Sequence, residues 1–202
     1  MYPIENDIAE KIETFTTNLL NGNIKDFYPD IIITDEMPDG YNMNGDGIII
    51  PKSIFLNENL LHKKKAFLSQ YNNVLGYSDK ELLATYYYYV LCHEATHKAR
   101  NNDGYDLTNP QEEKIADDNA VELTISRFND VFCLYLSVLL CNIVDQQESQ
   151  KNIKKYRISQ ETIDKDSHYT DKELLEFIKS KGSFTSEQEK IINSLNSTTV
   201  IK

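Results

Sequence analysis

Cysteine is scarce in this sequence, and its placement argues against a fold held together by disulfides. The 202 residues include three cysteines, an odd number without paired spacing: Cys92, Cys133 and Cys141. Two of them lie inside a long apolar run. We therefore expect reduced thiols in a hydrophobic core, which is typical of a cytoplasmic protein.

No stretch of the sequence is apolar for long enough to cross a membrane. The longest uncharged run, Val131–Val144, is bounded by Asp130 and Asp145 and is shorter than the roughly 20 apolar residues that a transmembrane helix needs. The first residues, Met1–Asp7, lack the basic start and apolar segment of a secretory signal. The sequence predicts a cytoplasmic chain without a membrane partner, and a buried core helix over the apolar run.

The sequence contains fewer basic than acidic residues. The 21 Lys and Arg residues face 32 Asp and Glu residues, which gives a formal net charge of -11. Such a chain repels a phosphate backbone, and no basic stripe interleaved with aromatic residues compensates, so we expect no nucleic-acid partner. The one basic cluster, His62–Lys65, falls in an expected helix between Asn57 and Tyr71 and is interpreted as a solvated helix face.

Glycine and proline are few, with seven and five residues, and we find no low-complexity tract or internal repeat. The length suits a single domain with its own core. The apolar spacing of Asn6–Leu20 predicts a helix, and the β-branched runs Ile31–Thr34 and Gly47–Ile50 predict two or three strands. Helical patterns dominate from Ser78 onward. The predicted fold class is therefore α+β, mainly helical with a small N-terminal sheet.

Capping boxes indicate where several of the later helices begin. They lie at Ser78–Glu81, Thr170–Glu173 and Ser186–Glu189. The polar stretch Asp145–Ser159 is interpreted as a connector. We therefore predict one domain over residues 1–145 and a helical C-terminal appendage over residues 146–202, packed on the same domain.

The motif that carries chemistry is His-Glu-Ala-Thr-His at residues 93–97. It lies in Asp79–Arg100, a segment without Gly or Pro that predicts one continuous helix. Because residues four apart share a helix face, His93 and His97 can bind one zinc ion while Glu94 stands beside the metal-bound water. A helix with two ordinary surface histidines is the alternative interpretation.

A catalytic zinc site needs a third protein ligand, and the next expected helix is rich in carboxylates. With Asn109 as its cap and Pro110 at its first position, Glu112 would complete a capping box. Glu113 and Asp117 remain, four apart on one face. Glu113 could reach the metal, and Asp117 could accept the free N–H of a zinc-bound histidine. A solvated acidic helix face is the alternative.

The motif at 93–97, followed by Glu-Lys-Ile-Ala-Asp at 113–117, resembles the zincin metallopeptidases of the gluzincin kind. The resemblance covers residues 78–128. It implies a zincin-like fold with an active-site helix, a metallopeptidase domain over residues 1–145, and an endopeptidase acting on a protein or peptide substrate. Small cytosolic peptidases similar to the Lit-type phage-exclusion proteases, or to peptidases of mobile elements that cleave a repressor, fit the size of the chain.

The same resemblance implies a role for each site residue. His93, His97 and Glu113 would bind one Zn²⁺ per chain, Glu94 would be the general base, and Asp117 would orient a ligand. No side chain for the tetrahedral oxyanion is evident, and by chemistry alone the candidates are His168, Tyr105 and Tyr169.

Zincins commonly hold their substrate along an edge strand that precedes the active-site helix. Gly47–Phe55 occupies the corresponding place, and Pro51 is typical of an edge. The tyrosine run Tyr86–Tyr89 is expected to pack in the core.

Two other functions compete with the peptidase. One is a binding or immunity protein in which the zincin fold is catalytically idle, although the retention of Glu94 argues against it. The other is a structural zinc module, which would need a closed site with four ligands, rich in Cys. Cys92 is next to His93 but faces another direction on the helix.

Overall fold

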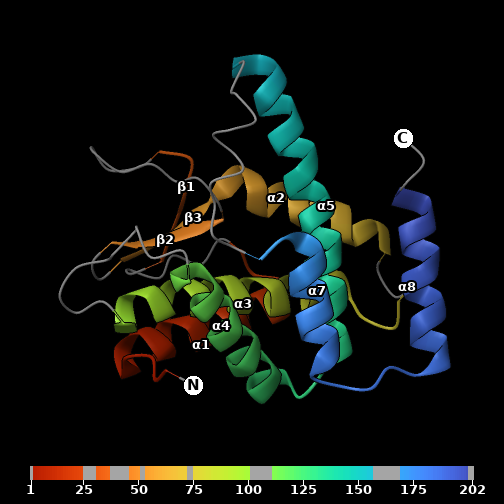
Figure 1. The fold of residues 1–202 in the computed structure, drawn as a ribbon. Coiled ribbons are helices and arrows are strands. Elements are labelled where there is room, and N and C mark those ends of the chain that lie inside the picture. Colours follow the sequence, from red (N-terminus) through yellow and green to blue (C-terminus); the bar gives the residue numbers. More distant parts are fainter. Residues whose placement is uncertain are drawn as a thin grey trace.

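The computed structural model describes residues 2–24, 31–36, 46–50, 53–71, 75–100, 111–156 and 169–199. In chain order the elements are α1 (Asn6–Leu20), β1 (Ile31–Thr34), β2 (Gly47–Ile50), β3 (Ser53–Asn57), α2 (Glu58–Leu68), the 3-10 helix η1 (Ser69–Tyr71), α3 (Asp79–Arg100), α4 (Glu112–Phe128), α5 (Val131–Tyr156), α7 (Asp171–Ser180) and α8 (Ser186–Thr199). The predicted α+β class, mainly helical with a small sheet near the N-terminus, is confirmed (Figure 1).

The sheet has three strands in the order β1-β3-β2. β3 lies in the middle, parallel to β1 and antiparallel to β2, with Ile50 opposite Ser53. The prediction of one edge segment over Gly47–Phe55 is therefore right only for β2, because Ser53–Phe55 belongs to the central strand. Pro51 lies outside the described residues.

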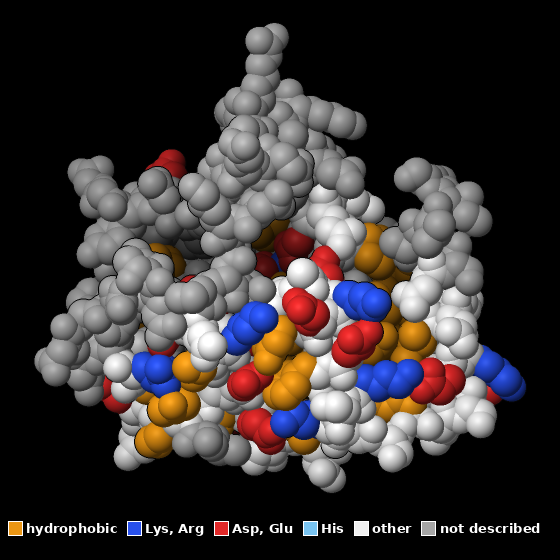
Figure 2. All heavy atoms as spheres, in the orientation of Figure 1, with side chains coloured by type: hydrophobic (Ala, Val, Ile, Leu, Met, Phe, Trp, Pro, Cys, Tyr) orange, Lys and Arg blue, Asp and Glu red, His pale blue; other side chains and the backbone are white. Residues whose placement is uncertain are grey.

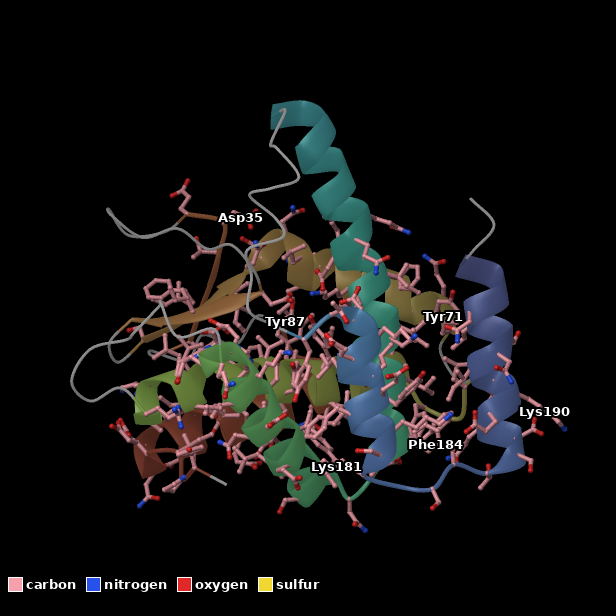
Figure 3. The ribbon with its side chains drawn as sticks, viewed as in Figure 1. Asp35, Tyr71, Tyr87, Lys181, Phe184 and Lys190 are labelled. Carbon is pink, nitrogen blue, oxygen red and sulfur yellow. The ribbon has the colours of Figure 1, made fainter. Side chains whose placement is uncertain are left out.

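Helix α3 is the centre of the fold, and α1, α2, α4, α5 and strand β2 all pack against it (Figure 1). A helix surrounded in this way must be apolar on most faces, which explains why the sequence of α3 shows so little amphipathic pattern. The tyrosine run fills part of this core as predicted. Tyr86, Tyr87 and Tyr89 are buried, and Tyr87 lies in the interior at the middle of Figure 3.

The apolar run Val131–Val144 forms the first part of α5, and Cys92, Cys133 and Cys141 are all buried with free thiols, as expected. None of the helices in the described ranges is both long and apolar enough to span a membrane. The prediction of a connector from residue 145 is wrong, since α5 stays helical to Tyr156.

The C-terminal helices share the core of the preceding segments. Leu174 and Ile178 of α7 are buried in the same apolar cluster as α3 and α5. Phe184, between α7 and α8, places its ring 5.2 Å from that of Phe132 and 5.3 Å from that of Tyr135, measured between centroids (Figure 3). The division at residue 145 stays a prediction, but α5 runs across it without a break.

Two of the three predicted capping boxes form as expected, at Ser78 with Glu81 and at Thr170 with Glu173. The third is shifted by one residue. The Gln188 amide N–H donates to Thr185 Oγ1 at 3.2 Å, and the Thr185 amide N–H donates to Gln188 Oε1 at 2.8 Å. Thr185–Gln188 and Ser186–Glu189 both match the capping pattern, so the pattern alone did not determine which residue caps the helix.

In the basic cluster on α2, His62 and Lys63 are at least partly exposed, but Lys64 is completely buried, so the prediction of a solvated helix face is wrong for Lys64. Its ammonium lies 2.8 Å from Asp145 Oδ1 and also contacts Asp46, while donating to the Tyr86 hydroxyl at 3.0 Å. A buried charge is tolerated when opposite charges and hydrogen bonds compensate it. These partners come from the residue before β2, from α3 and from α5, so the local sequence around Lys64 gave no sign of them.

This buried lysine cluster predicts how stability changes with pH. Burial, and then the negative charge of Asp46, raise the pKa of Asp145 to about 6, although Lys64 and Tyr86 oppose the shift; the Cys141 thiol also faces Lys64. A carboxyl group with a raised pKa binds its proton more readily in the folded chain than in the unfolded one. Between pH 6 and about 4, the folded state is therefore favoured as the pH falls.

We expect the melting temperature of the wild type to rise relative to that of Asp145→Asn on going from pH 7 to about pH 4.5. Thermal unfolding of both proteins across this range measures the difference. Glu176→Gln, which removes an exposed carboxylate from α7, serves as the matched control and should follow the wild type. Parallel curves for the wild type and Asp145→Asn would contradict the expectation.

The surface in view in Figure 2 carries acidic and basic side chains interspersed with apolar ones. Surface ion pairs of the chain include Lys181 Nζ with Glu122 and Lys179 Nζ with Glu189 Oε1 at 2.7 Å. Because exposed pairs of this kind contribute little stability, we attribute the fold to the apolar core around α3.

Candidate metal centre

The site lies where α4 packs on the second half of α3. Two residues on the face of α4 that carries Glu113 and Asp117, Ala116 and Ala120, are small and completely buried, which allows the two helices to pack closely. Asn119 of α4 donates from Nδ2 to Thr96 Oγ1 of α3 at 2.8 Å, inside the same contact. This crossing brings residues 20 positions apart in the sequence into one cluster.

Three donor atoms converge at this crossing. His93 Nε2 lies 3.0 Å from His97 Nε2, and Glu113 Oε2 lies 3.2 Å from the first nitrogen and 3.0 Å from the second. Within the described ranges, these three residues form the group of His, Cys, Asp and Glu side chains whose donor atoms are close enough to share a metal ion. The structure thus brings together the three residues that the sequence nominated, although their role as ligands stays a prediction.

The size of this triangle can be compared with what zinc requires. In a tetrahedral site with bonds of about 2.0–2.1 Å, neighbouring donor atoms lie about 3.3 Å apart. The observed separations of 3.0 to 3.2 Å are shorter by a few tenths of an ångström. Two imidazoles and one carboxylate also match the donor types of catalytic zinc sites, so the residues fit the ion in both geometry and chemistry.

The electrostatic surroundings of the triangle favour positive charge. Burial alone would lower the pKa of His93, but its contacts with the carboxylates of Asp117 and Glu113 outweigh burial and raise the pKa to about 10. The two carboxylates come from the same helix, and Asp117 is itself buried. A metal cation held between the imidazoles would balance the negative charge of these carboxylates, as the proton on His93 does.

Asp117 contacts the His93 ring on its Nδ1 side, away from the triangle. Its Oδ1 lies 2.8 Å from His93 Nδ1 and accepts a hydrogen bond from the Tyr89 hydroxyl at 2.6 Å. If the Nδ1 proton is directed to this carboxylate, the Nε2 lone pair faces the triangle, as a metal ligand requires. Tyr89 lies four residues before His93 and shares its face of α3, as the helical spacing indicated. Core packing is confirmed for its buried ring, and its hydroxyl also takes part in the site.

We expect Asp117→Ala to lower zinc affinity by roughly ten- to a hundredfold, because the His93 ring loses the group that fixes its orientation. Tyr89→Phe, which keeps the ring and removes only the hydrogen bond to Asp117, should give a smaller loss in the same direction. Competition with a chromogenic chelator measures both affinities. An Asp117→Ala protein that binds zinc as tightly as the wild type would rule out this role.

The structure corrects the assignment of Glu112. Helix α4 begins at Glu112 and its N-cap is Gln111, so Glu112 stands at the first helical position, and no capping box forms there. The side chain is buried instead. Its Oε1 accepts from Arg100 Nε at 2.7 Å and lies 3.9 Å from His97 Nδ1. The expected cap, Asn109 with Pro110, lies outside the described residues.

The remaining predicted site residues are the general base Glu94 and the three oxyanion candidates. Glu94 follows His93 on α3 and is partly exposed. The Tyr169 hydroxyl donates to Asp118 Oδ1 at 2.9 Å, so Tyr169 would have to leave this bond to stabilise an oxyanion. The other two oxyanion candidates, Tyr105 and His168, lie outside the described residues.

Comparison of the chain with models of known protein families, with characterised proteins and with solved structures found no significant match. Interpretation of the site therefore depends on its own residues and geometry.

Proposed function

We propose that this protein is a zinc-dependent endopeptidase that hydrolyses peptide bonds in a protein substrate. The observation that carries the proposal is the triangle of His93 Nε2, His97 Nε2 and Glu113 Oε2, with edges of 3.0 to 3.2 Å. Asp117 orients the first imidazole from its far side. Three protein ligands with room for a water molecule are characteristic of catalytic zinc sites.

Bound zinc would supply a water molecule of lowered pKa and would polarise the carbonyl group of the scissile bond. Glu94 is the residue that we assign as general base. Its carboxylate would take the proton from the attacking water and later deliver it to the leaving amine. His93 and His97 would act only as ligands, with the Nδ1 of His93 held by Asp117.

We further propose a zincin-like arrangement in which β2 receives the substrate. β2 is an edge strand of the sheet and packs against α3. Gly47, the first residue of β2, lies close to Val90 of α3, which is about one helical turn before His93. A Cβ atom built on Gly47 would lie 3.7 Å from Val90 Cγ1. A substrate segment that added to this edge in extended form would run beside the active-site helix, with backbone hydrogen bonds supplying the affinity.

A catalytically idle zincin-fold binding or immunity protein is the alternative that the experiments must exclude. It would keep the ligands but would have no need of a carboxylate at Glu94. We propose that the peptidase acts in the cytoplasm, which is supported by three buried cysteines with free thiols.

The proposal is tested by adding the zinc-loaded protein to a cytoplasmic protein extract and identifying new peptide termini by mass spectrometry. We expect a small set of new termini that disappears when a chelator removes the metal and returns when zinc is restored. If the zinc-loaded protein produces no new termini in the extract, the idle binding protein becomes the better interpretation.

A further inference from the structure

The two histidines of the site each have a carboxylate on the side away from the triangle. For His93 this is Asp117, whose Oδ1 lies 2.8 Å from Nδ1. For His97 it is Glu112, whose Oε1 lies 3.9 Å from Nδ1. The second distance is longer than a hydrogen bond, so Glu112 lies near His97 Nδ1 as a buried negative charge and not as a hydrogen-bond acceptor.

Glu112 is held in this place by contacts that do not involve the triangle. Arg100, at the end of α3, donates from Nε to Glu112 Oε1 at 2.7 Å. The Arg100 guanidinium in turn lies 4.6 Å from the centre of the Tyr2 ring. Glu112 is only 7% exposed, and a carboxylate buried to this extent requires a partner of this kind.

The N-terminal segment is itself fixed to the two site helices. The Tyr2 amide N–H donates to Asn119 Oδ1 at 2.7 Å, and Asn119 Nδ2 donates to the Tyr2 carbonyl at 3.1 Å. Asn119 also bonds to Thr96, next to His97. A continuous series of contacts therefore leads from Tyr2 through Arg100 and Glu112 to His97.

We propose that Glu112 is a positioning residue for His97, and that Arg100 and the Tyr2 segment hold its carboxylate toward His97 Nδ1. A carboxylate on this side favours the imidazole tautomer with its proton on Nδ1 and its lone pair on Nε2, directed into the triangle. The inference rests on the proposed metal site, and it adds the N-terminal segment and the end of α3 to the groups that determine metal affinity.

The test compares metal affinity, and not only activity, across four proteins. Co²⁺ and Zn²⁺ affinities are measured by chelator competition for the wild type, Glu112→Gln, Arg100→Ala and the control Glu122→Gln. Glu122 lies on the same helix and pairs with Lys181 at the surface, so its variant reports any general effect of losing an α4 carboxylate. The visible absorption of bound Co²⁺ and the melting temperature of each metal-free protein are recorded as well.

We expect Glu112→Gln to lower the affinity about tenfold and to change the Co²⁺ spectrum, whereas Glu122→Gln should match the wild type. Arg100→Ala should give a smaller loss, because Arg100 acts through Glu112. If Glu112→Gln proves unstable, Glu112→Asp keeps the charge, withdraws it by one methylene group, and should still weaken binding.

Wild-type affinity and spectrum in Glu112→Gln would overturn the inference while leaving the proposed function intact. A lower melting temperature of metal-free Glu112→Gln with unchanged affinity would also overturn it, because it would show a purely structural role. A wild-type protein that binds no metal would overturn both this inference and the proposed function.

Discussion

His93→Ala should abolish zinc binding by the purified protein, whereas the wild type should hold about one zinc ion per chain. The loss should be nearly complete, because removing one of three ligands leaves a buried site with two donors and an uncompensated carboxylate. His97→Ala should behave in the same way. Metal analysis after zinc loading and dialysis, with binding titrations on the same samples, measures the effect.

The structure supplies a matched control for this experiment. His62 lies on α2 with its side chain 51% exposed, beside Glu58. His62→Ala removes the same type of side chain from the surface and should bind zinc like the wild type. Absence of zinc from the loaded wild type, or an equal loss in His62→Ala, would contradict the assignment of His93 and His97 as ligands.

The third ligand is decided by comparing carboxylates on α4. We expect Glu113→Ala to lose zinc severely, because Glu113 Oε2 contacts both ring nitrogens of the triangle. Asp117→Ala and Glu112→Ala should retain weakened binding, since both carboxylates lie on the far sides of the histidine rings. If Asp117→Ala alone abolished binding, the aspartate would be the ligand, and the resemblance would shift toward zincins that use aspartate.

Local regularities were enough to predict most elements of the fold. Helix α1 lies over Asn6–Leu20 as its apolar spacing indicated, with Ile8, Ile12, Phe15 and Leu19 buried. Such patterns work because one helix face or strand face meets the core. They failed for Lys64, since its burial depends on Asp46 and Asp145, which are 18 residues and 81 residues away from it in the sequence. Nothing in a helical period indicates that a lysine will find such partners.

In the candidate site, too, local spacing predicted some features and only tertiary packing determined the others. The spacing of His93 and His97 is a property of one helix, and it could be read from the sequence directly. Glu113 could be nominated because its helix follows, but only the crossing of α3 and α4 shows that Oε2 reaches the two rings. Glu112 was misassigned because a carboxylate near a helix start is commonly a cap, and its true partner, Arg100, is fixed by tertiary packing.

Glu94→Gln should keep the metal but lose proteolysis. The amide has nearly the same shape as the carboxylate and leaves His93, His97 and Glu113 unchanged, so we expect zinc content equal to that of the wild type. It cannot accept the proton of the attacking water, and loss of a general base lowers the rate by about a hundredfold to ten-thousandfold. Rates of formation of the new peptide termini, measured with equal amounts of zinc-loaded protein, give the comparison.

The control for this variant is Glu122→Gln, which makes the same chemical change on the neighbouring helix α4, where Glu122 pairs with Lys181, and should cleave at the wild-type rate. Three outcomes separate the candidate roles of Glu94. Full activity in Glu94→Gln would remove it as the base. Loss of both zinc and activity would make Glu94 part of the metal environment. Retained zinc with lost cleavage is the result that a general base predicts, and it would also exclude the idle binding protein, because that protein has no cleavage to lose.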